Sequence, residues 1–291
     1  MTINDLINIG IKKLSKSSSA ALDAEVLLSH VLDKPKEYLL TNPDKNVSPK
    51  LEKKYKILLS RRSQSWPVAY LTGKKEFNRL TFKVDKNVLV PRPETEGLVD
   101  LVMSRINGLK SPISVLDIGT GSGNIIISLA KALADSHNAN AKYYASDVSA
   151  KALTVAKKNA ALHKVEVTFK QGSLLKPWTN QSFSLIVANL PYLAKQTDPS
   201  TKFEPKGALV APEKGLKLFE DLFLQTSSLT SLPSSVILEI GHDQGKQIKK
   251  LAVKLLPAYE TKIYKDLSNR DRYAILSLLS SSRQRRQQVQ V

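Results

Sequence analysis

Cysteine is absent from the 291 residues of this chain. Its absence excludes disulfide bonds, cysteine nucleophiles and zinc sites built from thiolates, and it fits a reducing compartment. Histidine is scarce, and the four residues present, His30, His137, His163 and His242, show none of the spacings typical of metal ligands. We therefore expect no metal site in this protein.

Long apolar runs are also missing. No segment approaches the roughly 20 apolar residues that a membrane-spanning helix needs. The start of the chain contains Asp5 and lacks the unbroken apolar core of a signal peptide. The hydrophobic content of 42% is that of a globular protein, and 291 residues are enough for one large domain and a small one. We expect a cytoplasmic protein with no membrane association.

Acidic residues are too few to balance the basic ones, since 44 Lys and Arg stand against 26 Asp and Glu, a net charge of +18. Such a charge indicates either a nucleic-acid or ribosomal partner or a solvated surface that aids solubility. The lysines are scattered along the chain, and no aromatic-rich RNA-binding motif accompanies them. Direct nucleic-acid binding is thus compatible with the composition but is not required by it.

Residues 1–75 are predicted to form a small all-helical domain, because their apolar residues recur at helical spacing. Thr2 and Asp5 are placed as a capping pair for the first helix, and Ser48-Pro49 is a suitable start for a later one. Residues 76–91 then read as two short strands, with turn residues Asp85-Lys86-Asn87 between them. We expect this segment to be a β-hairpin that links two domains.

Strands and helices alternate over residues 92–280. This alternation predicts an α/β fold with a seven-stranded, mostly parallel sheet and helices on both faces. The last two strands have no helix-length gap between them, so we expect them to pair antiparallel at one edge. Residues 281–291 form a basic tail without an apolar face, which we expect to be disordered. The expected strands are 113–118, 141–146, 165–170, 183–188, 235–240, 259–264 and 272–277.

A glycine-rich loop, Gly119-Thr120-Gly121-Ser122-Gly123, follows the first of these strands and opens an apolar helix. Glycines permit a tight turn and a close approach of backbone to ligand, and such sheets bind ligands beyond the carboxyl ends of their strands. Dinucleotide-binding loops follow Gly-x-Gly-x-x-Gly/Ala, whereas this loop is Gly-x-Gly-x-Gly followed by Asn124. The spacing favours S-adenosylmethionine over a nicotinamide dinucleotide. The alternative is a glycine turn without a ligand.

Asp147 ends the second strand, where a carboxylate can accept hydrogen bonds from both ribose hydroxyls of a nucleoside. The alternative is that Asp147 or Ser149 caps the following helix. The turn after the third strand would lie beside the adenine, and there Leu174 would pack against the ring although Ser173 offers no carboxylate. We therefore predict that Gly119–Gly123, Asp147 and Leu174 bind the methyl donor.

Asn189-Leu190-Pro191-Tyr192 directly follows the apolar strand 183–188. Such a turn is suited to hold a planar –NH2 group. The Asn189 oxygen accepts one N–H, the Leu190 carbonyl accepts the other, and Tyr192 covers the flat face. These acceptors would also stabilise positive charge that develops on the nitrogen during attack. We predict methyl transfer to an amide or amino nitrogen, with Asn189, Pro191 and Tyr192 as catalytic residues. The alternative is a turn that only ends the strand.

Further segments strengthen this interpretation. The most specific is Val88–Glu96, which contains Pro91-Arg92-Pro93-Glu94-Thr95-Glu96. The others are Asp23–Leu28, Pro67–Gly73 with Glu76-Phe77, Glu239–Gly241 and Arg270–Tyr273. Together with the turn at Asn189, these segments resemble the release factor glutamine methyltransferases, the PrmC/HemK family, over residues from about 20 to 280.

The resemblance implies an S-adenosylmethionine-dependent protein-(glutamine-N5) methyltransferase that acts on the Gly-Gly-Gln glutamine of class 1 peptide chain release factors. It implies that Gly119–Gly123 and Asp147 hold the donor and that Asn189 contacts both donor and glutamine. The segment Asn189–Tyr192 would form the acceptor site, and the helical domain would help to grip the release factor. Arg92 and Glu94 would either shape the pocket or stabilise the domain junction. We expect a monomer.

Two positions depart from the family pattern, Leu190, which is usually proline, and Ser173, which is often aspartate. Pro191 still biases Leu190 toward extended geometry, so the needed carbonyl is retained. The turn Asn-Leu-Pro-Tyr also resembles that of ribosomal RNA adenine dimethyltransferases, and adenine presents an –NH2 group of much the same geometry. The open alternatives are therefore a ribosomal-protein glutamine, an rRNA adenine, and a non-catalytic ribosome-associated module. The intact Asn189 and glycine loop argue against the last.

Overall fold

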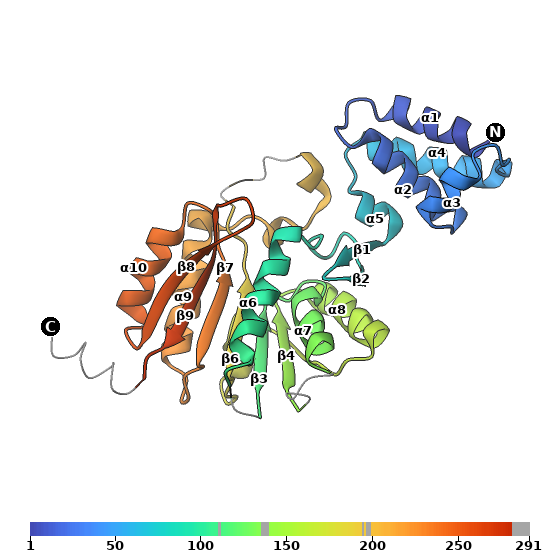
Figure 1. Ribbon diagram of the computed structural model, residues 1–291. Coiled ribbons are helices and arrows are strands. Elements are labelled where there is room, and N and C mark those ends of the chain that lie inside the picture. Colours follow the sequence, from blue (N-terminus) through green and yellow to red (C-terminus); the bar gives the residue numbers. More distant parts are fainter. Residues whose placement is uncertain (110–111, 135–139, 194, 196–198, 281–291) are drawn as a thin grey trace. The chain divides into compact units, whose positions relative to one another are not determined.

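The computed structural model describes residues 1–109, 112–134, 140–193, 195 and 199–280. The predicted tail and His137 lie outside the described residues. The chain divides into two compact units, each with a core of its own (Figure 1). The first contains Met1–Lys74 and the short helix η3 (Pro199–Phe203), and the second contains the rest of the described chain from Lys75 onward.

The first unit is helical, as the apolar spacing predicted. Its helices are α1 (Ile3–Lys13), α2 (Ala20–Leu32), α3 (Lys36–Thr41), α4 (Pro49–Ser63) and α5 (Val68–Thr72). Thr2 and Asp5 form the expected capping box at the start of α1, and α4 begins at Pro49. Trp66 stacks on Phe203 with ring centroids 4.3 Å apart, which joins η3 to this unit.

A two-stranded hairpin, β1 (Lys74–Phe77) and β2 (Leu80–Lys83), follows, but its position differs from the prediction. The turn is made by Asn78 and Arg79, with φ of 48° and 61°, so both central residues take the left-handed conformation that matches the strand twist of a tight hairpin. The expected turn at Asp85–Asn87 is instead a local loop in which the Asn87 N–H donates to Asp85 Oδ1 at 2.8 Å. Residues 88–90 form no strand, so that part of the prediction was wrong.

The second unit is built on a seven-stranded sheet of order β5-β4-β3-β6-β7-β9-β8. The five strands of this sheet from β3 to β7 are parallel, and β9 runs antiparallel to both β7 and β8. The mostly parallel sheet and the antiparallel pairing of the last two strands are therefore confirmed. The strands are β3 (Ser114–Ile118), β4 (Lys142–Asp147), β5 (Thr168–Gln171), β6 (Leu185–Asn189), β7 (Ser235–Glu239), β8 (Tyr259–Lys265) and β9 (Asp271–Leu278).

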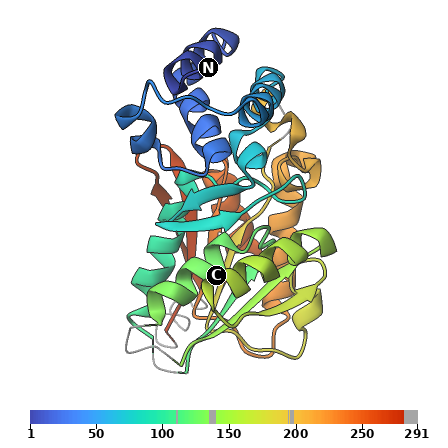
Figure 2. The same cartoon turned by 90° about the vertical axis from the view of Figure 1, so that its right-hand side faces the viewer.

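Helices cover both faces of this sheet (Figure 2). Successive strand residues point to opposite faces, so Val187 packs with one set of helices while Ile186 and Ala188 pack with the other. The first set comprises α6 (Glu96–Ile106), α7 (Asn124–Leu133) and α8 (Ala150–His163), and the second α9 (Leu216–Ser227) and α10 (Gly245–Leu255). No helix in the described part of the chain is long and apolar enough to span a membrane.

The order of strands reverses between β3 and β6. From β3 the chain continues outward through β4 and β5, then returns to place β6 on the other side of β3 and continues through β7. The connections that leave β3 and β6 therefore diverge, and a crevice at their carboxyl ends is the usual ligand site of such sheets. Gly119, Asp147, Asn189 and Glu239 all end or follow parallel strands at this edge.

Asn159 on α8 ties the hairpin to the glycine loop, and its side chain is fully buried. Its Oδ1 accepts from the Lys83 N–H at 2.7 Å, and its Nδ2 donates to the carbonyls of Lys83 at 2.9 Å and Ser122 at 2.8 Å. We expect Asn159→Ala to lower the free energy of unfolding by about 1–3 kcal/mol, because backbone groups lose their partners. Urea denaturation would measure this, with the exposed Asn107→Ala as the control. Equal stability of the two variants would contradict the assignment.

Candidate active site

The glycine loop that follows β3 takes a conformation suited to glycine. Gly119, Gly121 and Gly123 have φ of 72°, 55° and 81°, in the left-handed region that other residues avoid. The loop is held by the Ser146 carbonyl, which accepts from the N–H groups of Gly119 at 2.8 Å and Thr120 at 3.0 Å. A Cβ atom at Gly121 would meet no atom of the described part of the chain within 4 Å, so there is open space beside the loop.

Asp147 at the end of β4 lies against this loop. Its Oδ2 accepts from the Gly121 N–H at 2.9 Å, and its Oδ1 accepts from the Ser149 N–H at 2.8 Å. Burial raises the pKa of this carboxyl, and these backbone hydrogen bonds oppose the shift. Ser149, not Asp147, caps α8, because its hydroxyl accepts from the Ala152 N–H at 3.2 Å. Each Asp147 oxygen keeps a second lone pair for a ligand hydroxyl.

The turn after β5 lies on the same side of the strand-order reversal as the glycine loop. Gly172 donates its N–H to the Asp147 carbonyl at 3.0 Å, which brings this turn beside the end of β4. Leu174 has a φ of 51° and is buried, and its carbonyl accepts from the Ser146 hydroxyl at 3.4 Å. The structure thus brings Gly119–Gly123, Asp147 and Leu174 to one edge of the sheet.

Asp117 lies beneath the glycine loop and was not among the predicted site residues. It is fully buried, and its Oδ2 accepts from the Thr120 hydroxyl at 2.6 Å while its Oδ1 has no hydrogen-bond partner among the described residues. Burial raises its pKa to about 7, the Thr120 hydrogen bond opposes that shift, and the nearby Asp147 adds to it. The loop therefore rests on a carboxyl group that is costly to ionise.

The turn Asn189–Tyr192 follows β6, on the other side of the strand-order reversal, and packs between two glycines. Leu190 is buried, and its side chain lies next to Gly119, where an added Cβ would be 3.4 Å from Leu190 Cδ2. Gly215, which precedes α9, has a φ of 79°, and a Cβ there would lie 2.2 Å from the Pro191 carbonyl oxygen. Only glycine fits at position 215 without moving the turn, so both sides of the turn are fixed by close backbone packing.

A chain of hydrogen bonds reaches the turn from three other elements. Asn189 Nδ2 donates to Thr95 Oγ1 at 3.1 Å, and the Thr95 hydroxyl donates to Glu239 Oε2 at 2.8 Å. The Tyr192 hydroxyl donates to Glu239 Oε1 at 3.1 Å and accepts from Arg272 Nη1 at 3.1 Å. Nδ2 of Asn189 donates to Thr95. The Oδ1 atom of Asn189 is therefore the one that can accept a hydrogen bond from the –NH2 group of a methyl-accepting substrate.

Glu239 is the centre of this chain and is only 2% exposed. Burial raises its pKa, whereas the hydrogen bonds from Thr95 and Tyr192 and the charge of Arg272 oppose that shift. Burial also raises the pKa of Tyr192, so the phenol keeps its hydrogen and can donate. Arg272 is held in turn by Asp266, with Nε 3.1 Å from Asp266 Oδ2.

Arg92 and Glu94, the remaining predicted site residues, have other partners. Arg92 Nη2 lies 2.6 Å from Glu204 Oε1, and Glu204 Oε2 also accepts from the Val90 N–H at 3.1 Å. Glu94 is exposed, and its backbone carbonyl accepts a hydrogen bond from the Tyr273 hydroxyl. The ion pair anchors the segment that precedes η1 (Pro93–Thr95), and η1 in turn carries Thr95 to the site.

The roles of Thr95, Glu239 and Arg272 were not predicted, although each lies in a segment that carried the family resemblance. Neither periodicity nor spacing could have found them, because they are far apart in the chain and meet only through sheet register and one short helix. No group of three or more His, Cys, Asp or Glu side chains among the described residues could hold a metal ion.

Comparisons with known proteins agree with this architecture. Residues 5–73 match the PrmC N-terminal domain family, and residues 109–245 match a methyltransferase domain family. A release factor glutamine methyltransferase of Vibrio cholerae serotype O1 is 37% identical over 246 residues, 81% of this chain and 82% of that protein. The release factor glutamine methyltransferase of Moorella thermoacetica is 34% identical over 281 residues, 94% of this chain and 97% of that protein. The catalytic domain of hMettl16 in complex with MAT2A 3′UTR hairpin 1 shares the fold alone, with TM-score 0.57 and 13% identity over 87% of this chain and 91% of that chain.

Asp117→Asn should stabilise the protein more at about pH 8 than at about pH 5. The folded carboxyl has its pKa raised from 3.8 to about 7, so in this window the folded state binds the proton that the unfolded state has lost. Stability of the wild type therefore falls as the pH rises, and asparagine removes this cost while keeping an acceptor for Thr120. Thermal unfolding at both pH values measures the difference, with the exposed Asp100→Asn as control. An equal gain at both values would contradict the assignment.

Proposed function

The chain belongs to the release factor glutamine methyltransferase family, and we propose that its substrate is the glutamine of the Gly-Gly-Gln motif in class 1 peptide chain release factors. The protein is a methyltransferase that acts on protein glutamine, and its methyltransferase domain implies the use of S-adenosylmethionine. The residues that hold donor and acceptor are the next part of the proposal, and their geometry supports it.

The donor half of the proposed site is the crevice beside the glycine loop. S-adenosylmethionine, when bound, supplies a methyl group on a sulfonium, so that the acceptor nitrogen gains a C–N bond, the C–S electron pair stays on sulfur, and the nitrogen releases a proton. The space beside Gly121 would admit the donor close to the backbone. Asp147 has lone pairs left for the two ribose hydroxyls, and the turn that contains the buried Leu174 would lie beside the adenine.

The acceptor half is the turn Asn189–Tyr192, and the orientation of the Asn189 amide is the observation that carries the proposal. Its Nδ2 is bound to Thr95, so Oδ1 would accept one N–H of the glutamine side chain and the Leu190 carbonyl the other. An amide nitrogen is a poor nucleophile, so these acceptors act by aiming it and by stabilising the positive charge that develops on it. The ring of Tyr192, held at its hydroxyl by Glu239 and Arg272, would cover the flat face.

The helical first unit would contact the release factor. Helix α4 exposes Lys53, Lys54 and Lys56 together with Ile57, and α3 exposes Leu40 at 71%. Exposed apolar side chains among basic ones are suited to a protein partner with acidic and apolar surface. We therefore assign substrate grip to this unit and catalysis to the second.

A second candidate, amino methylation of an rRNA adenine, is favoured by two observations, Leu190 in place of the usual proline and the basic net charge. An adenine –NH2 would meet the same two acceptors, and the net charge of +18 would favour RNA. Methylation of an rRNA adenine does not explain the segment that carries Arg92, Glu94 and Thr95. The first candidate therefore remains the conclusion.

Methyl transfer from radiolabelled S-adenosylmethionine distinguishes the candidates when purified release factors, ribosomal proteins and rRNA are offered separately. We expect label on a class 1 release factor, at the glutamine of Gly-Gly-Gln, and loss of label when that glutamine is replaced by alanine. Label on rRNA alone would overturn the proposal in favour of the second candidate, and label on a ribosomal protein would keep the chemistry but change the substrate.

Asn189→Ala and Asp147→Ala should separate the two halves of the site. Asn189→Ala should reduce kcat by roughly 100-fold or more, because preorganised acceptors at the reacting nitrogen are lost, while the Kd for S-adenosylmethionine changes little. Asp147→Ala should weaken donor binding by about 10-fold, the effect of losing charge-assisted hydrogen bonds. Single-turnover kinetics and calorimetry measure the two effects. Full activity of the first variant, or unchanged donor affinity of the second, would refute its role.

A further inference from the structure

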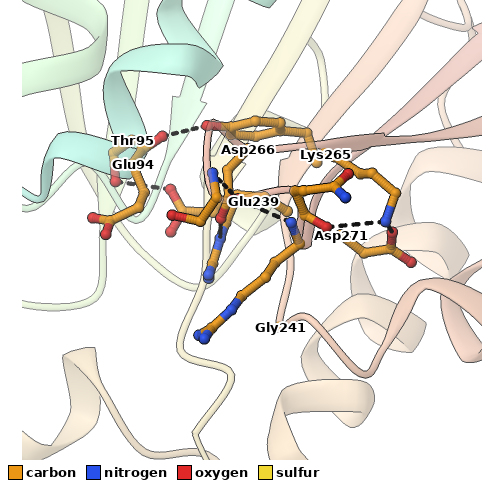
Figure 3. Close-up of polar contacts among 12 residues, drawn as sticks. Glu94, Thr95, Glu239, Gly241, Lys265, Asp266 and Asp271 are labelled. Carbon is orange, nitrogen blue, oxygen red and sulfur yellow. Dashed lines mark hydrogen bonds and ion pairs between the residues drawn. The ribbon is translucent and has the colours of Figure 1, made fainter.

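The buried carboxyl group of Glu239 lies behind Asn189, the residue proposed to bind the methyl-accepting substrate. One residue, Thr95, bridges the two side chains. Sheet register pairs Asn189 with Glu239, and Thr95 joins the two side chains with bonds of 3.1 Å and 2.8 Å. Thr95 and Glu239 are each 2% exposed, so solvent has little access to replace either bond. Figure 3 shows the Thr95 side chain beside Glu239. The ionisation state of a buried group is thereby linked to Asn189.

The link has a direction because a hydroxyl group has only one hydrogen to donate. An ionised Glu239 can only accept, so Thr95 donates to it and is left to accept from Asn189. Asn189 must then present Nδ2 to Thr95 and Oδ1 to the opposite side. Oδ1 is the atom that the proposed function requires, because an –NH2 acceptor offers only donors.

A second hydroxyl group obeys the same rule. Arg272 can only donate, so the Tyr192 oxygen accepts from Nη1 and its hydrogen points to Glu239 Oε1. Asp266 holds the other side of the guanidinium, which fixes Arg272 in this role. The Glu239 carboxylate therefore directs the hydroxyl groups of both Thr95 and Tyr192, and it thereby orients both side chains.

We propose that Glu239 is a positioning residue whose ionised carboxylate, acting through Thr95, keeps the Asn189 oxygen turned toward the acceptor nitrogen and, by accepting from the Tyr192 hydroxyl, holds the Tyr192 side chain in place. The inference rests on the proposed function. A protonated Glu239 would donate to Thr95 and reverse the chain, so that Thr95 donates to Asn189. The Asn189 amide would then turn over and present its own –NH2 group to the –NH2 group of the substrate. Two donors cannot form a hydrogen bond with each other.

The surroundings of Glu239 make this reversal accessible to pH. Burial and the charge of Glu94 favour the protonated form, whereas the two hydroxyl groups and Arg272 favour the ionised form. The net effect is a raised pKa, so the oriented state is lost as the pH falls. The groups that face Glu239 are Glu94 and Thr95 from η1, Tyr192 from the turn, and Arg272 and Tyr273 from β9.

Thr95→Val tests the relay without changing side-chain shape. With saturating donor and the accepted substrate, we expect kcat to fall by about 10- to 100-fold, the size of effect that misplacing a reacting group produces. The donor Kd should stay within about twofold, and Thr95→Ser, which keeps the hydroxyl group, should restore most of kcat. Thr226→Val is the matched control, because Thr226 is also fully buried and its hydroxyl donates only to the Leu222 carbonyl.

Glu239→Gln tests the charge. We expect kcat to be lower in this variant. We also expect the variant to lack the fall in kcat at acidic pH that the wild type shows as Glu239 takes up its proton. Combined with Thr95→Val it should cost less than the sum of the two single changes, since both act through one chain. Asp271→Asn is the control, because Asp271 lies on β9 at the same end of the sheet but pairs with Lys265 at 3.3 Å (Figure 3).

The outcomes separate this inference from the proposed function. If the wild type methylates no release factor glutamine, the proposed function fails. If it does, but Thr95→Val keeps full kcat or Thr95→Ser is as impaired as Thr95→Val, the relay is overturned. A fall in kcat at acidic pH that persists in Glu239→Gln would equally overturn the relay. If Glu239→Gln fails to bind the donor, the comparison of Thr95→Val with Thr95→Ser decides alone.

Discussion

The reversal of strand order between β3 and β6 is the constraint on which the site depends. Because the chain leaves the two adjacent strands in different directions, the glycine loop and the Asn189 turn lie on either side of the point where ligands of such sheets usually bind. The close packing of Leu190 on Gly119, and of Gly215 on the Pro191 carbonyl, then sets how near the two halves lie. A donor and an acceptor bound on either side would meet in the space between them, and holding two reactants in one geometry is a large part of catalysing their reaction.

Buried carboxyl groups are the second feature of the site. Asp117 under the glycine loop and Glu239 behind the turn are both withdrawn from water, and burial raises the pKa of each. Such groups are costly to ionise, and a fold optimised for stability alone would avoid them. Here each supports a loop that we propose contacts a reactant. Glu239 has acceptors for two hydroxyl groups and no hydrogen of its own when ionised, which is the property needed to orient neighbours that can point either way.

Much of this architecture could be predicted from local patterns. The strands around Val115, Ile186 and Val236 were expected from their apolar runs, and the capping box at Thr2 from its spacing. The hairpin was placed wrongly, because Asn78-Arg79 is a less obvious turn than Asp85–Asn87 and both can adopt turn geometry. Local turn signals do not tell which of two candidate turns pairs the strands; that depends on cross-strand packing, in which Phe77 and Phe82 meet edge to face.

The sequence by itself determined the α/β class, the glycine loop and the Asn-Leu-Pro-Tyr turn, because periodicity and turn chemistry act over a few neighbouring residues. Only the tertiary structure decided which polar side chains meet behind that turn. Thr95, Asn189, Glu239 and Arg272 come from four separate segments, and their contacts depend on strand register and on the path of η1. The direction of each hydrogen bond among them follows from where the single hydroxyl hydrogens must point. That direction is a property of the assembled network, which no single segment contains.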